Sequence, residues 1–287
     1  MLTREDHPSP TEPSTWGFTA STGLPFTHQT IVDAHFRACI EPYRNLLNQA
    51  GIRPGMRVLD AGCCGGDFLP WLAELTGPHG RVSAIDLAEE HVTRATERVR
   101  SWHLPCPVDI RQGSITQLPY PDDSFDAVWC SNTVELLTDD ELRAALREMR
   151  RITRPGGLVA IKDVDGYSFA ARPGDPYLFT DLFRTAGATP GYAQQVLRTR
   201  DLYQWMRETG LHSIRQHTTL IEHFAPFTTD VRSYYAPAFA ELAAQAKKLG
   251  LTSPDWDTLL DPAHPNSPFN HPDGYVCEGN TLAVGTA

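Results

Sequence analysis

The sequence lacks any apolar run that approaches the roughly 18 residues required by a membrane-spanning helix. Its first ten residues also lack the apolar core of a secretory signal peptide. We therefore expect a cytoplasmic protein that does not insert into a membrane.

Basic residues are too few for a nucleic-acid partner. The chain carries 25 lysines and arginines against 35 aspartates and glutamates, giving a net charge of −10, and it has no basic run. Because DNA and RNA binding requires Lys and Arg to neutralise many phosphates, this balance argues against such a substrate.

Spaced metal-ligand motifs are missing as well. The six cysteines are Cys39, Cys63, Cys64, Cys106, Cys130 and Cys277. They form no Cys-x-x-Cys pair or zinc spacing, and the eleven histidines show no metal motif. We expect reduced, buried thiols and no metal site.

What the chain does contain is typical of a soluble globular protein, with 41% apolar and 21% charged residues. Its 287 residues suffice for one large α/β domain with elaborations, or for a domain plus a small cap.

The most informative segment runs from Val58 to Phe68, where an apolar strand ends in Asp60 and a glycine-rich turn leads into a helical pattern. Free backbone N–H groups and a helix dipole converge on such a turn and can hold a ligand. A carboxylate at Asp60 would repel a pyrophosphate, so it favours a ligand with positive charge, such as an ammonium or a sulfonium.

A second apolar strand, from Arg81 to Asp86, also ends in an acid. Its carboxylate can accept hydrogen bonds from two vicinal ribose hydroxyls. Asp86 could equally cap the helix expected over residues 88–102, and the two roles are compatible. We favour ribose binding.

Further strand ends follow in the same order. Residues 108–112 read as a third strand that leads to Gly113, Ser114 and Ile115, and residues 118–137 contain a fourth strand. A helix over residues 141–152 then precedes the turn Pro155-Gly156-Gly157 and a fifth strand.

Together these segments, roughly residues 50–165, resemble class I S-adenosylmethionine-dependent methyltransferases. The sequence departs from the family pattern Asp-x-Gly-x-Gly-x-Gly at Cys64, which stands in place of the middle glycine. Ser114 stands where the family often has an acidic residue. The resemblance implies that S-adenosylmethionine is the cofactor. It also implies that the cofactor is bound by Asp60, Gly62, Cys63, Gly66, Asp86, Leu87, Gly113, Ser114, Ile115, Cys130 and Ser131.

We predict an α/β, Rossmann-like fold: a seven-stranded, mostly parallel sheet with an antiparallel last strand and helical lid insertions. The expected parts are an N-terminal arm and lid helix (1–50), the cofactor-binding core (51–165), a helical lid with the last core helix (166–212), and two late strands around a helical cap (213–287). Residues 1 to about 15 read as a poorly ordered arm. The lid helix covers roughly residues 30–50, with Pro42 near a bend. About fifty residues separate the late strands, which favours a cap over a hairpin.

The apolar, aromatic insertions predict a small, largely apolar acceptor. Their size resembles that of methyltransferases acting on lipids, quinones or secondary metabolites, and this resemblance implies an acceptor of that kind, methylated on O, N or C. If the acceptor loses a proton, a base must lie at the pocket rim. The candidates are Glu135, Glu222 and His223, with Asp163 and Asp165 also at strand ends. Side chains alternate along a strand, so only one of Glu222 and His223 can point into the pocket.

Two other interpretations remain open at this point. The fold could serve a non-methylating biosynthetic enzyme such as a cyclase, because fold does not fix function. The chain could also be a regulatory protein that has lost cofactor affinity, with Cys64 and Ser114 as traces of that loss. The sequence is compatible with a homo-oligomer.

Overall fold

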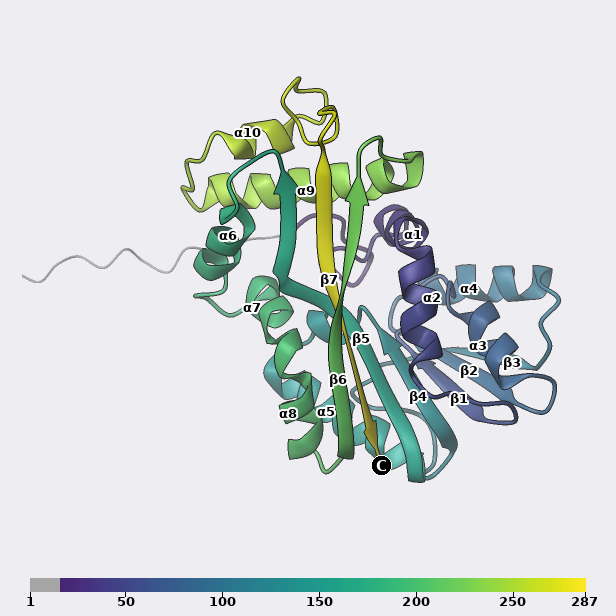
Figure 1. Ribbon diagram of the computed structural model, residues 1–287. Coiled ribbons are helices and arrows are strands. Elements are labelled where there is room, and N and C mark those ends of the chain that lie inside the picture. The colour runs from purple at the N-terminus through teal and green to yellow at the C-terminus, as the bar shows by residue number, and fades with distance from the viewer. Residues whose placement is uncertain (1–15) are drawn as a thin grey trace, which may run out of the picture.

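The computed structural model describes residues 16–287, and the arm expected over residues 1 to about 15 lies outside the described residues. A seven-stranded sheet with the order β3-β2-β1-β4-β5-β7-β6 organises this part of the chain (Figure 1). The strands are β1 (Arg57–Ala61), β2 (Arg81–Asp86), β3 (Val108–Gln112), β4 (Phe125–Ser131), β5 (Thr153–Arg172), β6 (His212–Phe224) and β7 (Tyr275–Thr286).

The strand directions confirm the predicted fold class. β1 pairs in parallel with β2 and β4, β2 with β3, and β4 with β5. β7 enters between β5 and β6 and runs antiparallel to both. The sheet is therefore mostly parallel with an antiparallel last strand.

Ten α-helices accompany the sheet in the described part of the chain. They are α1 (Gln29–Ala38), α2 (Ile40–Asn48), α3 (Leu69–Thr76), α4 (Glu89–Ser101), α5 (Asp139–Ile152), α6 (Leu178–Ala186), α7 (Tyr192–Leu197), α8 (Leu202–Glu208), α9 (Thr229–Lys248) and α10 (Asp255–Leu260). Two short 3₁₀ turns, η1 (Val134–Leu136) and η2 (Arg198–Asp201), join them.

The helix expected over residues 30–50 is divided in two at Cys39, which lies between α1 and α2. Pro42 stands in the first turn of α2. It has no N–H to donate to the carbonyl four residues earlier, and its ring crowds that carbonyl, so one continuous helix cannot pass through Ala38.

Alternating strand residues supply two cores, one on each face of the sheet. Val58, Val82 and Trp129 pack in the core that α2 and α3 complete. Their strand neighbours Leu59 and Val128 pack in the core that α5 and α8 complete. This alternation is the period of two expected for parallel strands covered on both faces.

The late strands carry the cap. β5, β6 and β7 continue past the ends of β1 to β4, and α9 and α10 lie across these extensions, with α6 beside them (Figure 1). The insertion between β6 and β7 therefore contains α9 and α10, and β5 runs without a break across position 165. The pairing advances by five residues along β5, from Asp165 to Ala170, but by only two along β7, from Gly279 to Cys277, so β5 bulges here.

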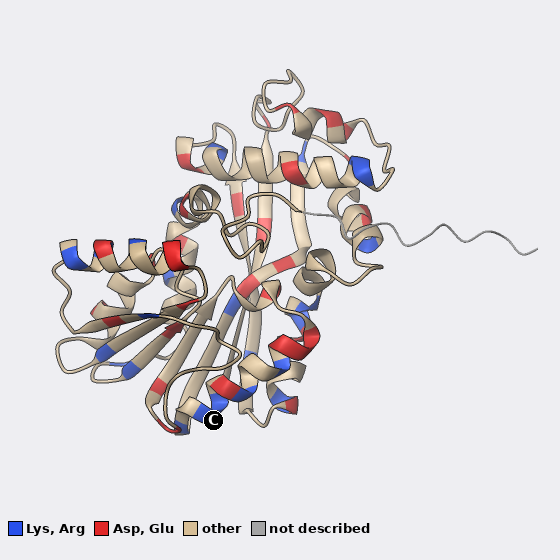
Figure 2. Ribbon diagram, turned by 180° about the vertical axis from the view of Figure 1, so that it is seen from behind, with Lys and Arg blue, Asp and Glu red and all other residues tan. Residues whose placement is uncertain are grey.

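Charge is mixed over the molecule: acidic and basic turns alternate along the outer helices (Figure 2). No helix among the described residues is both long and apolar enough to cross a membrane.

Candidate functional site

The main pocket lies at the carboxyl ends of β1, β2, β4 and β5, under α1, α9 and the segment before α1. Open α/β sheets bind ligands at this edge. The predicted site residues that line it are Asp60, Gly62, Cys63, Asp86, Leu87, Gly113, Ser114, Ile115, Ser131 and Glu135. The sheet thus brings ten of the sixteen predicted residues to one cavity.

The turn after β1 winds through alternating left-handed residues: Gly62 has φ +84°, Cys64 has φ +44° and Gly66 has φ +82°. Cys64 therefore adopts a glycine-like conformation at the position where the family pattern has glycine. Gly66 does not line the pocket. A β-carbon there would lie 2.9 Å from Leu69 Cδ1, so Gly66 allows the turn to pack on α3.

Two polar atoms in the pocket wall are buried and have no hydrogen-bond partner within the described residues: Asp60 Oδ2 and Ser131 Oγ. Burial, with the nearby charges of Asp86 and Asp67, raises the pKa of the Asp60 carboxyl to about 8. Unpaired buried polar atoms are costly, so this pair is suited to a cationic donor from a ligand. The ammonium group of S-adenosylmethionine is such a donor, and the site fits it.

Asp86 holds the neighbouring backbone in place. Its Oδ2 accepts a hydrogen bond from Cys64 N (2.8 Å), while its Oδ1 accepts from Ala88 N (3.0 Å) and from His91 Nδ1 (3.0 Å). α4 begins at Glu89 with Ala88 as its cap residue, so Asp86 stabilises the entry to this helix without capping it. A carboxylate fixed on three sides is well prepared to orient a ribose.

The adjoining wall is mostly apolar. Leu87 remains half-exposed at the pocket mouth, and Ile115 is buried. Gly113 N donates to Asp86 O (2.9 Å), which fixes the exit of β3. Ser114 Oγ interacts with its local partner Thr116 Oγ1 at 2.7 Å. Cys130 does not line the pocket, because its side chain is fully buried on the α5 face of β4.

Glu135 lines the pocket, yet its hydrogen bonds are structural. Its Oε2 accepts from Val164 N (2.9 Å), and its own N–H donates to Asp163 Oδ2 (2.7 Å). Burial, and then the charge of Asp163, raises the pKa of Glu135 well above its usual value. The pKa of Asp163, which also accepts from Thr133 N, is raised by burial to about 7. The Glu135 carboxyl group is thus tied to the backbone of β5, and the direction of the Glu135 pKa shift favours the protonated form.

Asp165 belongs to the bulge in β5. Its carboxylate accepts from Tyr167 N (3.0 Å) and pairs with Arg200, whose Nη2 lies 2.8 Å from Oδ2. It is fully buried and does not line the pocket.

The expectation that Glu222 or His223 reaches the pocket is not met. β6 is the edge strand, and β7 separates it from β5 and from the pocket. Glu222 is exposed and accepts from Tyr275 Oη (3.0 Å). His223 is the more inward of the two, but its ring packs against Tyr235 of α9, 5.2 Å between centroids. The strands extend so far that their ends carry the cap instead of the pocket rim.

Sequence reasoning did not identify the polar group at the lid end of the pocket. This end of the pocket is lined by His35 and Tyr43 from the N-terminal helices and by Asn132 after β4. Behind these side chains lie the buried Lys162 and Glu278. Two signals were available: a histidine at an apolar position of the predicted lid helix, and a glutamate inside the apolar last strand. Neither indicates a partner.

Comparison with known proteins agrees with this geometry. A family profile described as a methyltransferase domain matches residues 58–157. The methyltransferase GfsG of Streptomyces halstedii is 35% identical over 119 residues, which are 42% of this chain and 41% of that protein. The demethylmenaquinone methyltransferase of Geobacillus stearothermophilus is 28% identical over 177 residues, 61% of this chain and 71% of that protein.

A solved structure of a putative methyltransferase from Bacillus halodurans shares the fold. Its TM-score is 0.54 at 16% identity, over 84% of this chain and 96% of that chain. The chain thus spans less than half the length of the Streptomyces relative and most of the Bacillus structure. The strand order, the glycine turn after β1 and the acids Asp60 and Asp86 agree with the match over residues 58–157. This part of the chain is therefore similar to class I S-adenosylmethionine-dependent methyltransferases.

Proposed function

We propose that this protein transfers a methyl group from S-adenosylmethionine to a small, largely apolar acceptor. The observation that carries the proposal is the pair of unsatisfied atoms, Asp60 Oδ2 and Ser131 Oγ, in the wall of a pocket that also contains Asp86. They are suited to the cationic end of the cofactor, and the rest of the pocket is suited to an apolar partner.

The cofactor's parts can be assigned to separate walls. Gly62 and Cys63 would face its amino-acid end together with Asp60 and Ser131. Asp86 would hold the ribose, and Leu87, Gly113, Ser114 and Ile115 would enclose the adenine, with contacts from backbone groups and apolar side chains. Gly66 and Cys130 would contribute indirectly, without lining the pocket. Gly66 would shape the turn after β1, and Cys130 would shape the end of β4.

The acceptor end of the pocket favours an aromatic or aliphatic molecule. Its walls carry Phe36, Phe169, Phe183, Tyr192, Tyr234 and Leu242. Phe169, which the bulge in β5 turns inward, stacks on Phe183 with 5.5 Å between ring centroids. One relative's name gives demethylmenaquinone, a quinone, as its substrate.

S-adenosylmethionine supplies a methyl group already activated on a sulfonium. The chain's own task is to align the acceptor and to exclude water, and such positioning can be worth about 7–11 kcal/mol of a barrier. The lid helices and the cap close the pocket from above and can perform both parts of this task.

The proposal is tested with methyl-tritiated S-adenosylmethionine and an organic-solvent extract of bacterial cells. We expect label to appear in organic-soluble products and S-adenosylhomocysteine to form in equal amount. Asp86→Ala is the matched variant: it removes charge-assisted hydrogen bonds worth about 1.5–3 kcal/mol each, so cofactor affinity should fall at least tenfold.

Calorimetric titration separates the competing interpretations. A wild-type protein that does not bind S-adenosylmethionine would be a regulatory protein, and the proposal would fail. A protein that binds it but converts metabolites without forming S-adenosylhomocysteine would be a non-methylating enzyme. An Asp86→Ala affinity within threefold of wild type would refute the ribose assignment.

A further inference from the structure

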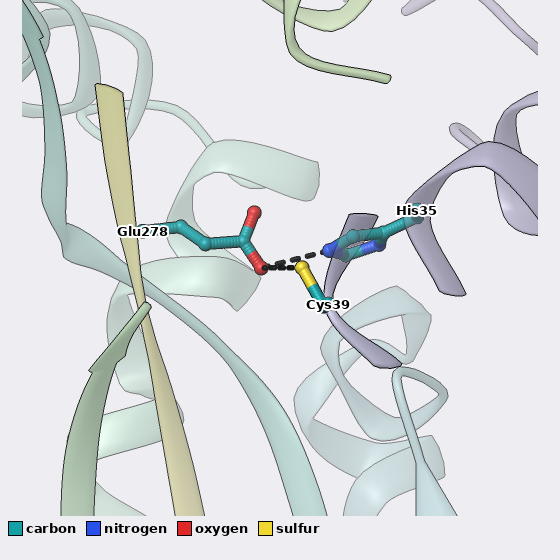
Figure 3. Close-up of side chains that lie close together, drawn as sticks. All are labelled: His35, Cys39 and Glu278. Atoms are coloured by element: carbon teal, nitrogen blue, oxygen red, sulfur yellow. Dashed lines mark hydrogen bonds and ion pairs between the residues drawn. The ribbon is translucent and has the colours of Figure 1, made fainter. Parts of the chain in front are cut away.

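Three side chains from the two ends of the chain meet behind the acceptor end of the pocket: His35 and Cys39 from the N-terminal helices and Glu278 from β7 (Figure 3). His35 Nε2 lies 2.7 Å from Glu278 Oε1, and Cys39 Sγ lies 3.8 Å from the same oxygen. His35 also lines the pocket, whereas Glu278 is fully buried.

The neighbours of Glu278 settle its protonation. Oε1 accepts from the Asn280 amide (2.8 Å) and Oε2 accepts from Tyr234 Oη (3.3 Å). Burial opposes ionisation, but His35, Lys162 and Asn280 outweigh it and hold the pKa of Glu278 below its usual value. Glu278 is a carboxylate that receives hydrogen bonds from every side.

A carboxylate at 2.7 Å requires a hydrogen on His35 Nε2. Burial lowers the pKa of His35, so at neutral pH this is the ring's one hydrogen. Nδ1 then carries the free lone pair, and no hydrogen-bond partner for it occurs within residues 16–287. Histidine in this tautomer, held by a carboxylate at the other nitrogen, is the arrangement of a general base.

The ring is fixed in place by further contacts. Tyr234 stacks on it with 3.9 Å between centroids and an interplanar angle of 8°. Tyr43 Oη lies 2.7 Å from His35 Nε2 and accepts a hydrogen bond from Asn132 Nδ2 (3.2 Å). The side-chain oxygen of Asn132, Oδ1, accepts in turn from Lys162 Nζ (2.6 Å). A network this extensive orients the imidazole toward the pocket.

We infer that the acceptor is a planar aromatic or enolic hydroxyl compound whose O–H proton is taken by His35 Nδ1. The inference rests on the proposed methyl transfer and names its substrate class. A phenol fits this end of the pocket in two ways. Its flat face can pack against the rings of Phe169, Phe183 and Tyr192, and its hydroxyl carries a proton that His35 can accept. Glu278 is a positioning residue, which sets the tautomer of His35 and stabilises its protonated form.

The O–H bond breaks and its proton goes to Nδ1, so His35 becomes an imidazolium beside the Glu278 carboxylate. The oxygen's electron pair forms the bond to the methyl carbon, and the pair of the breaking S–C bond stays on sulfur. The proton on His35 then passes to solvent when the pocket opens.

The same three side chains have a spacing that a metal ion could use, because their ligand atoms lie within 4.8 Å of one another. Their chemistry argues against it. Burial beside Glu278 raises the pKa of the Cys39 thiol well above its usual value, so it remains protonated. The amide hydrogens of Asn280 occupy the oxygen that a metal would need.

The test uses 4-nitrophenol as a probe, with and without S-adenosylhomocysteine, at a pH about one unit below the probe's own pKa. We expect the wild-type protein to produce the yellow phenolate band of the bound probe. His35→Gln retains an N–H for Glu278 but has no basic nitrogen, and it should reduce the band at least tenfold. Glu278→Gln should move the band's pH midpoint upward, toward that of the free probe.

His223→Gln is the matched control: the same substitution at a histidine outside the pocket should leave the band unchanged. Absence of the band in the wild-type protein, or its survival in His35→Gln, would overturn the inference. If EDTA abolished the band of the wild-type protein, the phenolate would be bound to a metal ion, and the inference that His35 takes the proton would be wrong.

Calorimetric titration of S-adenosylhomocysteine on the same samples keeps the two proposals apart. If the ligand binds the wild-type and His35→Gln proteins equally and the band persists in the variant, only the assignment of His35 fails. If the ligand does not bind the wild-type protein, the proposed function fails, while the band still reports on His35.

Discussion

At the scale of single residues, Cys64 carries backbone strain that a glycine would not. Its φ of +44° lies in the left-handed region, which costs a non-glycine residue about 1–2 kcal/mol. We predict that Cys64→Gly increases the free energy of unfolding by up to about 1 kcal/mol, since greater freedom of the unfolded chain offsets part of the relief.

Urea unfolding under reducing conditions measures this effect. Cys64→Ala removes the thiol but retains a β-carbon, so it should give no gain. A Cys64→Gly protein less stable than wild type would show that the thiol's packing outweighs the strain.

Asp60 makes cofactor binding depend on pH. Its raised pKa, about 8, means that the carboxyl is mostly protonated in the free protein at pH 7. A cationic ligand favours the ionised form, so binding releases a proton. We predict that affinity for S-adenosylmethionine rises up to tenfold per pH unit below pH 8 and levels off above it.

Calorimetry in buffers of different ionisation enthalpy counts the protons released. Asp60→Asn does not titrate and should abolish that release from the protein, whereas the ligand's own amine titrates identically in both proteins. Equal proton release from the two proteins would rule out Asp60 as the linked group.

The same buried carboxyl also affects folding. Its pKa is raised above the unfolded value of 3.8, so its contribution to stability is fully present below pH 4 and is lost as pH rises toward 8. Wild-type stability should accordingly fall over that window relative to Asp60→Asn.

Residue-level prediction from the sequence succeeded where a motif is local and failed where two distant residues combine. Asp60 lies just before a glycine-rich turn and Asp86 ends the next strand, so their place in the pocket follows from a short stretch of sequence. His35 and Glu278 are 243 positions apart, and only the folded sheet brings β7 beside α1. Alternation showed that only one of Glu222 and His223 can point inward and left open which one, and it could not show that β7 stands between β6 and the pocket.

At the scale of elements, α4 fastens the segment that covers the cofactor end of the pocket. This strap, residues 16–28, places Thr22, Leu24 and Phe26 over the cavity. In the first turn of α4, Glu90 accepts hydrogen bonds from the backbone N–H and the hydroxyl of Ser21, both at 2.7 Å. The next residue, His91, contacts Thr27 O through Nε2 at 3.0 Å.

His91 must be doubly protonated to make both of its contacts, because Asp86 Oδ1 and Thr27 O can only accept. Burial acts to lower its pKa, but the hydrogen bond to Asp86 and the charges of Asp86 and Glu90 raise it above the usual value. The stabilisation is present below pH 6.5 and is lost as pH rises through the folded-state pKa.

We therefore predict that amide exchange within the strap, corrected for its intrinsic pH dependence, speeds up between pH 6 and pH 9. Hydrogen-exchange mass spectrometry measures it. In His91→Gln, which cannot titrate, the corrected rate should be fast and constant. A rise of the same size in the variant would mean that another group controls the strap.

Helices and strands were predicted well where their sequence signals are clear. They were predicted less well where tertiary contacts extend a strand beyond its local signal. The strand ends of the core follow from apolar runs that stop at an acid or a glycine. The sequence does not reveal that β5 continues to Arg172, because its extension pairs with β7 beyond the bulge and is covered by the cap. The pairing partner, not the local sequence, keeps this stretch extended.

At the scale of the whole molecule, the pocket is closed by parts from both ends of the chain. The strap and α1 precede the core, α9 follows β6, and all of them contribute side chains to one cavity. The buried network from Lys162 through His35 to Glu278 ties the early helices to β5 and β7. A ligand between the core and these covers should therefore stabilise the fold as a unit.

This coupling predicts a thermal shift. A ligand at 100 times its dissociation constant stabilises the folded state by about 2.7 kcal/mol. At about 2 °C per kcal/mol for a protein of this size, S-adenosylhomocysteine should raise the Tm of the wild-type protein by about 5 °C. Differential scanning calorimetry gives the shift, and Asp86→Ala at the same ligand concentration should show a clearly smaller one. If the variant shifted as far as the wild type, Asp86 would not contribute to the affinity for the ligand, and the assignment of Asp86 to the ribose would fail.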